Sequence, residues 1–141
     1  MTYHPGMVRR LLVASAVAAV VGAAAPTLVS AHAETGAPPC AFTLSPPRVV
    51  QISGVNMVTA TIDPAACSVS AEPTFLVACV QMRGSSSTEQ CDTTQGPGTA
   101  QVFYSPYRPG ATYTSTGRGC ASTGNPPQSI CQTTGPLTAT L

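Results

Sequence analysis

Six cysteines are the most reactive side chains of this 141-residue chain. Thiolates act as nucleophiles, as redox couples and as zinc ligands, whereas two thiols oxidised together form a disulfide. The six are Cys40, Cys67, Cys79, Cys91, Cys120 and Cys131. An even number of cysteines in a short exported chain predicts a disulfide framework, because compartments outside the cytosol oxidise thiols.

How the cysteines pair is a separate question, because six of them allow many connectivities. Closure of the shortest loops favours pairing in sequence order, which predicts Cys40–Cys67, Cys79–Cys91 and Cys120–Cys131. The second pair would bracket the polar loop 83–90 and staple a hairpin, and the third would bracket residues 121–130. Glycine and proline in residues 121–130 predict irregular structure there. Each bridge is expected to stabilise the fold by about 3 kcal/mol.

Histidine and lysine, which often activate nucleophiles, are missing from the part of the chain that carries the cysteines. Both histidines, His4 and His32, lie within residues 1–33, and the chain has no lysine. This excludes Ser-His-Asp and Cys-His catalysis, histidine metal ligands and a lysine Schiff base. Paired cysteines would leave no thiolate either. We therefore predict that the protein is not an enzyme and holds no cofactor and no metal.

Carboxylates are the remaining candidates for catalysis, and a glycosidase needs two of them facing each other across a cleft. Asp63 and Glu72 each precede a proline, and Asp63 is predicted to be a turn residue. Glu89 and Asp92 flank Cys91 and are predicted to be solvated charges. A calcium site formed by Glu89, Asp92 and loop carbonyls is the alternative, although no calcium-loop motif accompanies them.

The best candidate for a binding surface is residues 103–110, an aromatic segment interrupted by prolines. Tyrosine and arginine are enriched at recognition hot spots, and the prolines would leave the backbone little entropy to lose on binding. The predicted ligand or partner contacts are Tyr104, Tyr107, Arg108 and the nearby Tyr113. The alternative is a rigid turn whose tyrosines cover a sheet edge.

The first 33 residues have the three parts of a secretory signal peptide. Arg9 and Arg10 supply the positive start, residues 11–25 supply the apolar middle, and residues 31–33 supply the small-residue cleavage pattern. The apolar helix would be about 22 Å long, which is shorter than the roughly 30 Å hydrocarbon core of a membrane. We therefore expect cleavage rather than a membrane anchor.

Cleavage between Ala33 and Glu34 would divide the chain into a signal peptide, 1–33, and one secreted domain, 34–141. The localisation expected for the mature protein is extracellular. Two alternatives stay open within the leader. The arginine pair also fits a twin-arginine signal in place of ordinary Sec export, and Met7 also fits as the start.

The charge of the expected mature domain is small. It has four arginines and five acidic residues, and four minus five is a net charge of −1. Scattered arginines cannot form the basic patch that nucleic acid or an anionic membrane surface requires. The expected partners are a protein, a cell-envelope component or a small apolar ligand. The absence of lysine and the abundance of Ala, Thr, Pro and Gly point to a GC-rich, actinobacterial genome.

Two segments of the domain show the clearest strand patterns. Residues 55–62 alternate, with Val58, Ala60 and Ile62 on one face and threonines on the other, which predicts a half-buried strand with a solvent-facing threonine surface. Residues 74–82 are apolar on both faces, which predicts the most buried strand, at the centre of its sheet.

Further strands are predicted at residues 41–45, 48–52, 99–105, 111–115 and 137–141. About seven short strands separated by turns predict an all-β fold, an immunoglobulin-like antiparallel β-sandwich stapled by three disulfides and preceded by a signal-peptide helix. A small closed barrel is the alternative.

The domain resembles the neocarzinostatin family of small secreted actinobacterial sandwiches that carry enediyne chromophores. The likeness rests on the opening strand 42–46 before a Val-rich strand with Gly54, on Cys79 and Cys91, and on the late pair Cys120 and Cys131. The chain departs from that family in having more cysteines and no tryptophan, so no chromophore-contact residue is carried over. It also resembles small secreted mycobacterial proteins of unassigned function.

Two functions follow from these observations. The first is a non-catalytic extracellular binding or interaction module, which predicts an exposed aromatic patch around Tyr104, Tyr107 and Arg108. The second, which the resemblance implies, is a carrier of a small apolar ligand. It predicts a cleft between sheet and loops, with a concave apolar pocket flanked by the Cys79–Cys91 and Cys120–Cys131 hairpins.

Overall fold

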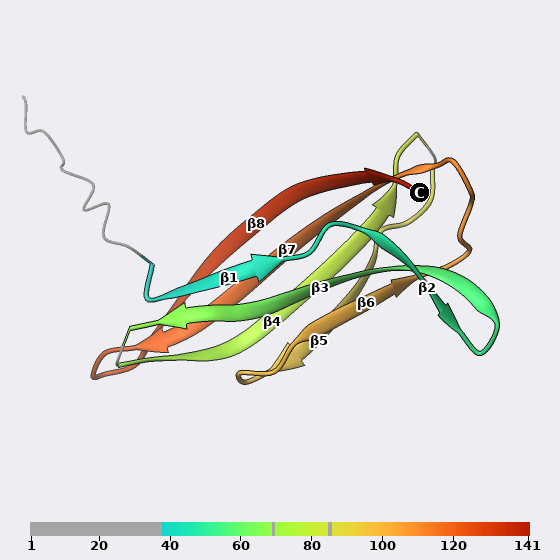
Figure 1. Cartoon of the computed structure of the whole chain (residues 1–141). Helices are drawn as coiled ribbons and strands as arrows, with labels where there is room; N and C mark the ends of the chain where they lie inside the picture. The colour runs from blue at the N-terminus through green and yellow to red at the C-terminus, as the bar shows by residue number, and fades with distance from the viewer. Residues whose placement is uncertain (1–37, 69, 85) are drawn as a thin grey trace, which may run out of the picture. The chain divides into compact units, whose positions relative to one another are not determined.

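Eight strands make up the protein in the computed structural model, which describes residues 38–68, 70–84 and 86–141 (Figure 1). The strands are β1 (Cys40–Leu44), β2 (Arg48–Ile52), β3 (Val55–Cys67), β4 (Ala71–Met82), β5 (Gln90–Gln95), β6 (Ala100–Tyr104), β7 (Thr112–Thr123) and β8 (Gln128–Thr140). The predicted signal peptide, its helix and its cleavage site at Ala33 and Glu34 lie outside the described residues. Within the described ranges, no helix is long and apolar enough to cross a membrane.

The strands form two antiparallel sheets. In sheet A, β3 pairs with β6 on one side, and on the other side it pairs with β2 along its first half and with β1 along its second half. Sheet B has the order β5-β4-β7-β8. The prediction of an all-β antiparallel sandwich is confirmed, as is the central position of residues 74–82 within β4.

The core lies between the inner faces of the two sheets. Successive strand residues point to opposite faces, so every second residue of a strand enters the core. The inward residues of the two central strands are fully buried: Val58, Ala60 and Ile62 of β3 and Leu76, Ala78 and Val80 of β4. The alternation read from residues 55–62 is therefore confirmed on its apolar side.

The three disulfides pair as predicted, in sequence order. Each joins two neighbouring antiparallel strands: Cys40–Cys67 joins β1 to β3, Cys79–Cys91 joins β4 to β5, and Cys120–Cys131 joins β7 to β8. Because each bridge lies in a register pair of an existing ladder, it reinforces a pairing that backbone hydrogen bonds already define.

Three local predictions are wrong. Asp63 and Pro64 do not form a turn but continue β3, where the register against β1 shifts between Ala41 and Phe42. Proline is tolerated at such an irregularity, because a ladder hydrogen bond is already interrupted there. The threonine side of β3 is not all solvated, since Thr59 is fully buried and donates from Oγ1 to the carbonyl of Val102, 2.8 Å away.

The third wrong prediction concerns residues 121–130, which were expected to be irregular. Strand β7 continues to Thr123 and β8 starts at Gln128, so only the short Gly- and Pro-containing turn between them lacks strand structure. The long pairing of β7 with β8, together with the pairing of β7 with β4, overrides the weak strand propensity of these residues.

Candidate functional site

Two of the four predicted contact residues are core residues. Tyr104 is 2% exposed and Tyr113 is fully buried, and their rings meet edge to face with centroids 5.6 Å apart. Each tyrosine occupies an inward position, Tyr104 at the end of β6 and Tyr113 near the start of β7. The expectation of an exposed aromatic patch is wrong for these two residues, because strand alternation turns both rings inward.

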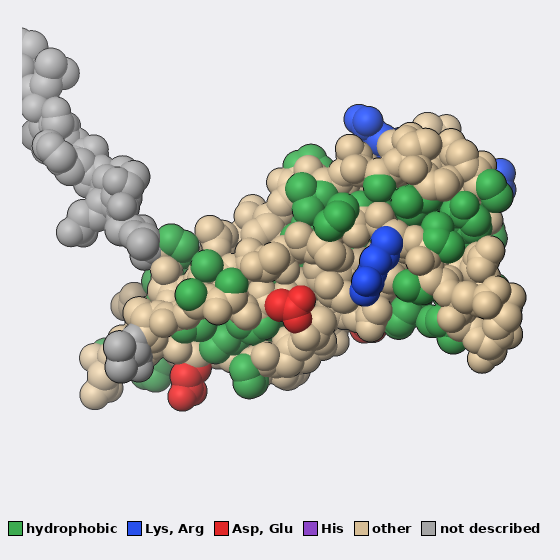
Figure 2. Space-filling view, viewed as in Figure 1, with side chains coloured by type: hydrophobic (Ala, Val, Ile, Leu, Met, Phe, Trp, Pro, Cys, Tyr) green, Lys and Arg blue, Asp and Glu red, His purple; other side chains and the backbone are tan. Residues whose placement is uncertain are grey.

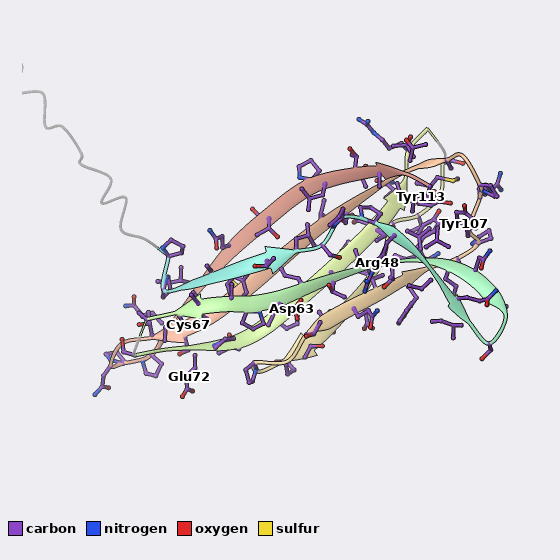
Figure 3. All side chains as sticks on the ribbon, in the orientation of Figure 1. Arg48, Asp63, Cys67, Glu72, Tyr107 and Tyr113 are labelled. Carbon is purple, nitrogen blue, oxygen red and sulfur yellow. A yellow bond between two sulfur atoms is a disulfide. The ribbon has the colours of Figure 1, made fainter. Side chains whose placement is uncertain are left out.

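The other two predicted contacts, Tyr107 (Figure 3) and Arg108, lie in the loop that follows β6. Tyr107 is half-buried and stacks on Tyr113 with ring centroids 6.5 Å apart, while Arg108 is exposed. The backbone N–H of Arg108 donates to the Tyr113 hydroxyl, 2.8 Å away. The loop thus closes over the end of the core, which matches the alternative interpretation of a rigid turn whose tyrosines cover a sheet edge.

Removing the Tyr113 hydroxyl tests this structural role. We expect Tyr113→Phe to lower the free energy of unfolding by about 1 kcal/mol, because the Arg108 N–H would lose its partly buried acceptor. Tyr107→Phe keeps that hydroxyl and is the matched control, with an expected change within about 0.5 kcal/mol. Guanidinium denaturation followed by circular dichroism compares the two, and equal losses would contradict the assignment.

The charged side chains are scattered over the surface, and Figure 2 shows red and blue groups separated by polar and hydrophobic ones. Asp63 lies on sheet A and accepts a hydrogen bond from the Thr99 hydroxyl. Glu72 is exposed at the start of β4 on sheet B (Figure 3). These two carboxylates therefore belong to different sheets.

The two remaining candidate carboxylates are separated by the plane of sheet B. Asp92 is registered with the inward-facing Ala78, and its Oδ1 accepts from the Thr93 N–H, 2.8 Å away. Glu89 instead lies beside Thr116, whose Oγ1 is 3.3 Å from Oε1 of Glu89. Glu89 and Asp92, although close in the sequence, therefore do not form a pair of facing carboxylates.

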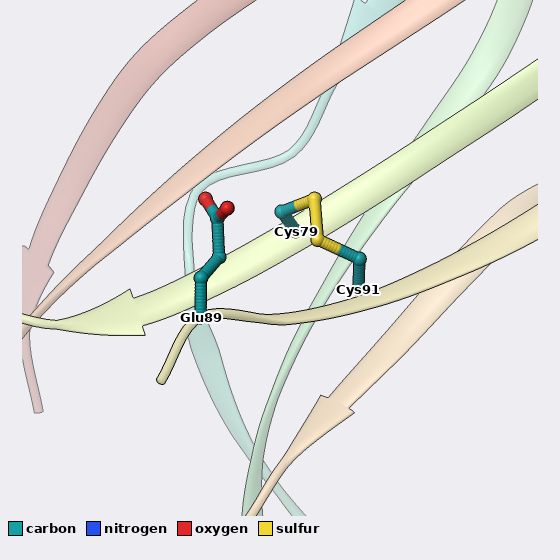
Figure 4. Close-up of side chains that lie close together, drawn as sticks. All are labelled: Cys79, Glu89 and Cys91. Carbon is teal, nitrogen blue, oxygen red and sulfur yellow. A yellow bond between two sulfur atoms is a disulfide. The ribbon is translucent and has the colours of Figure 1, made fainter. Parts of the chain in front are cut away.

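One group of potential metal ligands comes together at this point. The carboxylate of Glu89 and the sulfur atoms of Cys79 and Cys91 lie within 4.8 Å of one another (Figure 4). The two sulfurs are joined in a disulfide, and the thiolate is the form of cysteine that binds metal. When the disulfide is formed, the Glu89 carboxylate is therefore the one ligand of this group that could bind a metal ion.

The outer face of sheet B carries apolar side chains between the two hairpin disulfides. Leu76 and Ala78 point into the core, so Phe75 and Val77 of β4 point to the opposite face, as does Cys79. Phe75 and Val77 are half-buried rather than fully covered. Residues 74–82 are thus less buried than their apolar pattern predicted.

The register of sheet B brings both hairpin disulfides to this same face. Phe75 is paired with Cys120, Val77 with Arg118, and Cys79 with Cys91. The Cys120–Cys131 bridge lies in the row of Phe75, and the Cys79–Cys91 bridge lies four residues further along β4, with Val77 between the two rows. We call the set of Phe75, Val77, Arg118, Cys79–Cys91 and Cys120–Cys131 the disulfide face.

The spacing of Phe75, Val77 and Cys79 in the sequence could have predicted this face, although the apolar run over residues 74–82 made both sides of the strand look alike. Phe75, Val77 and Cys79 are spaced two apart, so all three lie on one side of a strand. A cysteine bonded to the neighbouring strand then marks the side to which Phe75 and Val77 belong. The contacts predicted in the aromatic segment rest on residue type, which does not distinguish an inward tyrosine from an outward one.

Comparison with protein-family models, with curated proteins and with solved structures finds no match to this chain, so its resemblance to the neocarzinostatin family stays a prediction.

Proposed function

We propose that this chain is a secreted, non-catalytic binding module of immunoglobulin-like architecture, and that the disulfide face is its binding surface. The observation that carries the proposal is the position of Phe75 and Val77, half-buried on the outer face of a central strand between two bridges. Outward apolar side chains on an otherwise Thr- and Gln-rich face are typical of contact surfaces. The signal-peptide pattern and the three disulfides support export.

The chemistry of the disulfide face favours a small apolar ligand over a charged one. Phe75 offers a ring face, and disulfide sulfur is polarisable and packs well against flat apolar groups. Arg118, registered beside Val77, supplies one cationic donor that would orient an acceptor group on such a ligand. Carrying a small apolar ligand is therefore the form of binding that we propose first.

A protein or cell-envelope partner is the second candidate function. Ile130 of β8, 43% exposed, is registered with the inward-facing Ala121, so it lies on the side of sheet B opposite to the disulfide face and offers a partner a separate apolar contact. Native mass spectrometry of the protein from its own culture medium distinguishes the two candidates. A retained small molecule supports the carrier, whereas a co-purified protein supports the second function.

Binding of an apolar fluorescent dye such as anilinonaphthalene sulfonate tests the surface itself. We expect Phe75→Thr to weaken dye binding about tenfold and Val77→Thr less, because each removes apolar area from the contact. Val55→Thr makes the same valine-to-threonine change as Val77→Thr at an exposed position on sheet A, and it is the matched control. Equal binding by Phe75→Thr and the unchanged protein would refute the proposal.

A further inference from the structure

Strand β2 is an open edge of sheet A that carries apolar side chains. It pairs with β3, and among the described residues no other strand pairs with it. Val49 and Ile52 are 38% and 41% exposed, and Val55 across the turn is 58% exposed. Figure 1 places the β2–β3 hairpin at one end of the molecule, and Figure 2 shows hydrophobic side chains among polar ones there.

Proteins that stay monomeric protect such an edge with lysine, proline or a bulge. Strand β2 has one charged side chain, Arg48 at its first position, and no proline, and its ladder against β3 has no register shift. Strand β8, at the edge of sheet B, contrasts with it, because β8 contains Pro136 and is contacted by β1. Beyond Arg48, the edge formed by β2 therefore has none of these protections and exposes apolar side chains.

We propose that β2 pairs antiparallel with the β2 strand of a second copy of this chain, so that two A sheets become one continuous sheet. The two-fold axis would pass through the sheet beside Val50. This interface is independent of the disulfide face, which belongs to sheet B.

The turn of the hairpin determines which backbone groups of β2 remain available. Ser53 and Gly54 have φ angles of 50° and 83°, as a two-residue type I′ turn requires. The flanking residues Ile52 and Val55 are register partners and form a hydrogen-bonded pair across the turn.

Hydrogen-bonded and non-hydrogen-bonded pairs alternate along an antiparallel ladder. Counting back from Ile52, the N–H and C=O groups of Val50 and Arg48 also point to β3. Those of Val49 and Gln51 therefore point to the open edge, where a second strand can accept and donate.

One register between two copies of β2 uses all the outward N–H and C=O groups of Val49 and Gln51. With Val50 opposite the second copy's Val50, each Val49 lies opposite the other copy's Gln51, and each such pair exchanges two hydrogen bonds. A shift of two residues in one direction places Pro47, which has no N–H, opposite Gln51. The opposite shift places the turn residue Ser53 opposite Val49. The edge is thus complementary to itself about Val50.

The side chains fit the same register. The two Val50 residues form a non-hydrogen-bonded pair, in which side chains approach most closely, and each adjoins Met57 of its own chain. The two Arg48 residues lie four positions apart, about 13 Å along the strands, beyond the Debye length of about 8 Å at physiological salt. Because the paired strands are short, we expect a weak dimer with a micromolar dissociation constant.

Introducing a charge at Val50, beside the two-fold axis, tests the proposed register. The protein is exported as the full chain, purified from the medium and measured by analytical ultracentrifugation from low micromolar to millimolar concentration. We expect a monomer–dimer equilibrium for the unchanged protein and monomers for Val50→Lys and Val50→Glu separately, since each places like charges opposite one another. A mixture of the two variants is expected to restore the dimer as a heterodimer.

A second pair of variants tests the backbone hydrogen bonds without adding charge. Gln51→Pro removes an outward N–H and is expected to weaken dimerisation at least about tenfold, while Gln51→Thr keeps the N–H and the dimer. Thermal melts confirm that each variant folds. A protein that remains monomeric at all concentrations overturns the proposal, as does a dimer that neither Val50→Lys nor Gln51→Pro weakens.

Discussion

A variant with alanine at both Cys40 and Cys67 is expected to lose about 4 kcal/mol of unfolding free energy, more than a variant lacking either other disulfide. This bridge spans 27 residues of sequence, against 12 for Cys79–Cys91 and 11 for Cys120–Cys131. The entropy of closing these loops in the unfolded chain corresponds to about 3.5 kcal/mol for the longest and about 2.8 kcal/mol for each of the others. Cys40 is 1% exposed, so its replacement by alanine also leaves a small cavity.

Losing the Cys40–Cys67 bridge would also loosen β1, because this bridge holds β1 at the edge of sheet A. Strand β1 is five residues long and carries the core side chains Phe42 and Leu44. Guanidinium denaturation of the three double-alanine variants, followed by circular dichroism, ranks the bridges. Equal losses from all three, or a larger loss at Cys120–Cys131, would contradict the expected order.

Gly119→Ala is expected to lower the free energy of unfolding by about 3 kcal/mol, and the melting temperature by roughly 15 °C. Gly119 occupies an inward position of β7, directly beneath the Phe42 ring of β1. A Cβ atom built on Gly119 would lie 2.4 Å from Cγ and Cδ1 of Phe42. The ring is 9% exposed and packed between the sheets, so it cannot move aside without opening the core.

Gly98→Ala is the matched control for this effect. A Cβ atom on Gly98 would meet only Cγ2 of Thr94, at 2.9 Å, and that half-buried side chain can turn aside near the surface, where water can replace its exposed hydrogen bond to the Thr99 carbonyl. We expect Gly98→Ala to change stability by less than about 0.5 kcal/mol. A double variant, Gly119→Ala with Phe42→Leu, is expected to recover part of the loss, and failure to recover any would show that the ring is not the cause.

Features that depend on neighbours in the sequence were predicted well. The disulfide pairing was correct because each pair joins strands that are consecutive, or separated only by the short β2, so the shortest loops are also the native ones. The buried face of residues 55–62 was correct because alternation directly encodes which side of a strand is apolar. The central position of residues 74–82 in their sheet was also correct, although the outer face of β4 is only half-buried.

Features that depend on distant contacts were predicted poorly. Asp63 and Pro64 form a turn pair by local propensity, but pairing with β1 extends the strand through them. The segment around Cys120 and Cys131 is weak in strand propensity, yet it forms long strands because β7 pairs with β4 and β8 pairs with β7. Local propensities of a few tenths of a kcal/mol are overridden when a neighbouring strand supplies hydrogen bonds and packing.

The residue content and spacing alone established an all-β sandwich, its disulfide pairs and a cysteine-bearing segment without histidine or lysine, because these follow from periodicity, loop closure and composition. Tertiary structure decided which surface is exposed. It placed Tyr104 and Tyr113 in the core, left Phe75 and Val77 half-exposed beside two bridges, and left β2 as an open edge. The physical reason is that a side chain's exposure depends on which sheet, strand or loop covers it, and those neighbours come from positions far away in the chain.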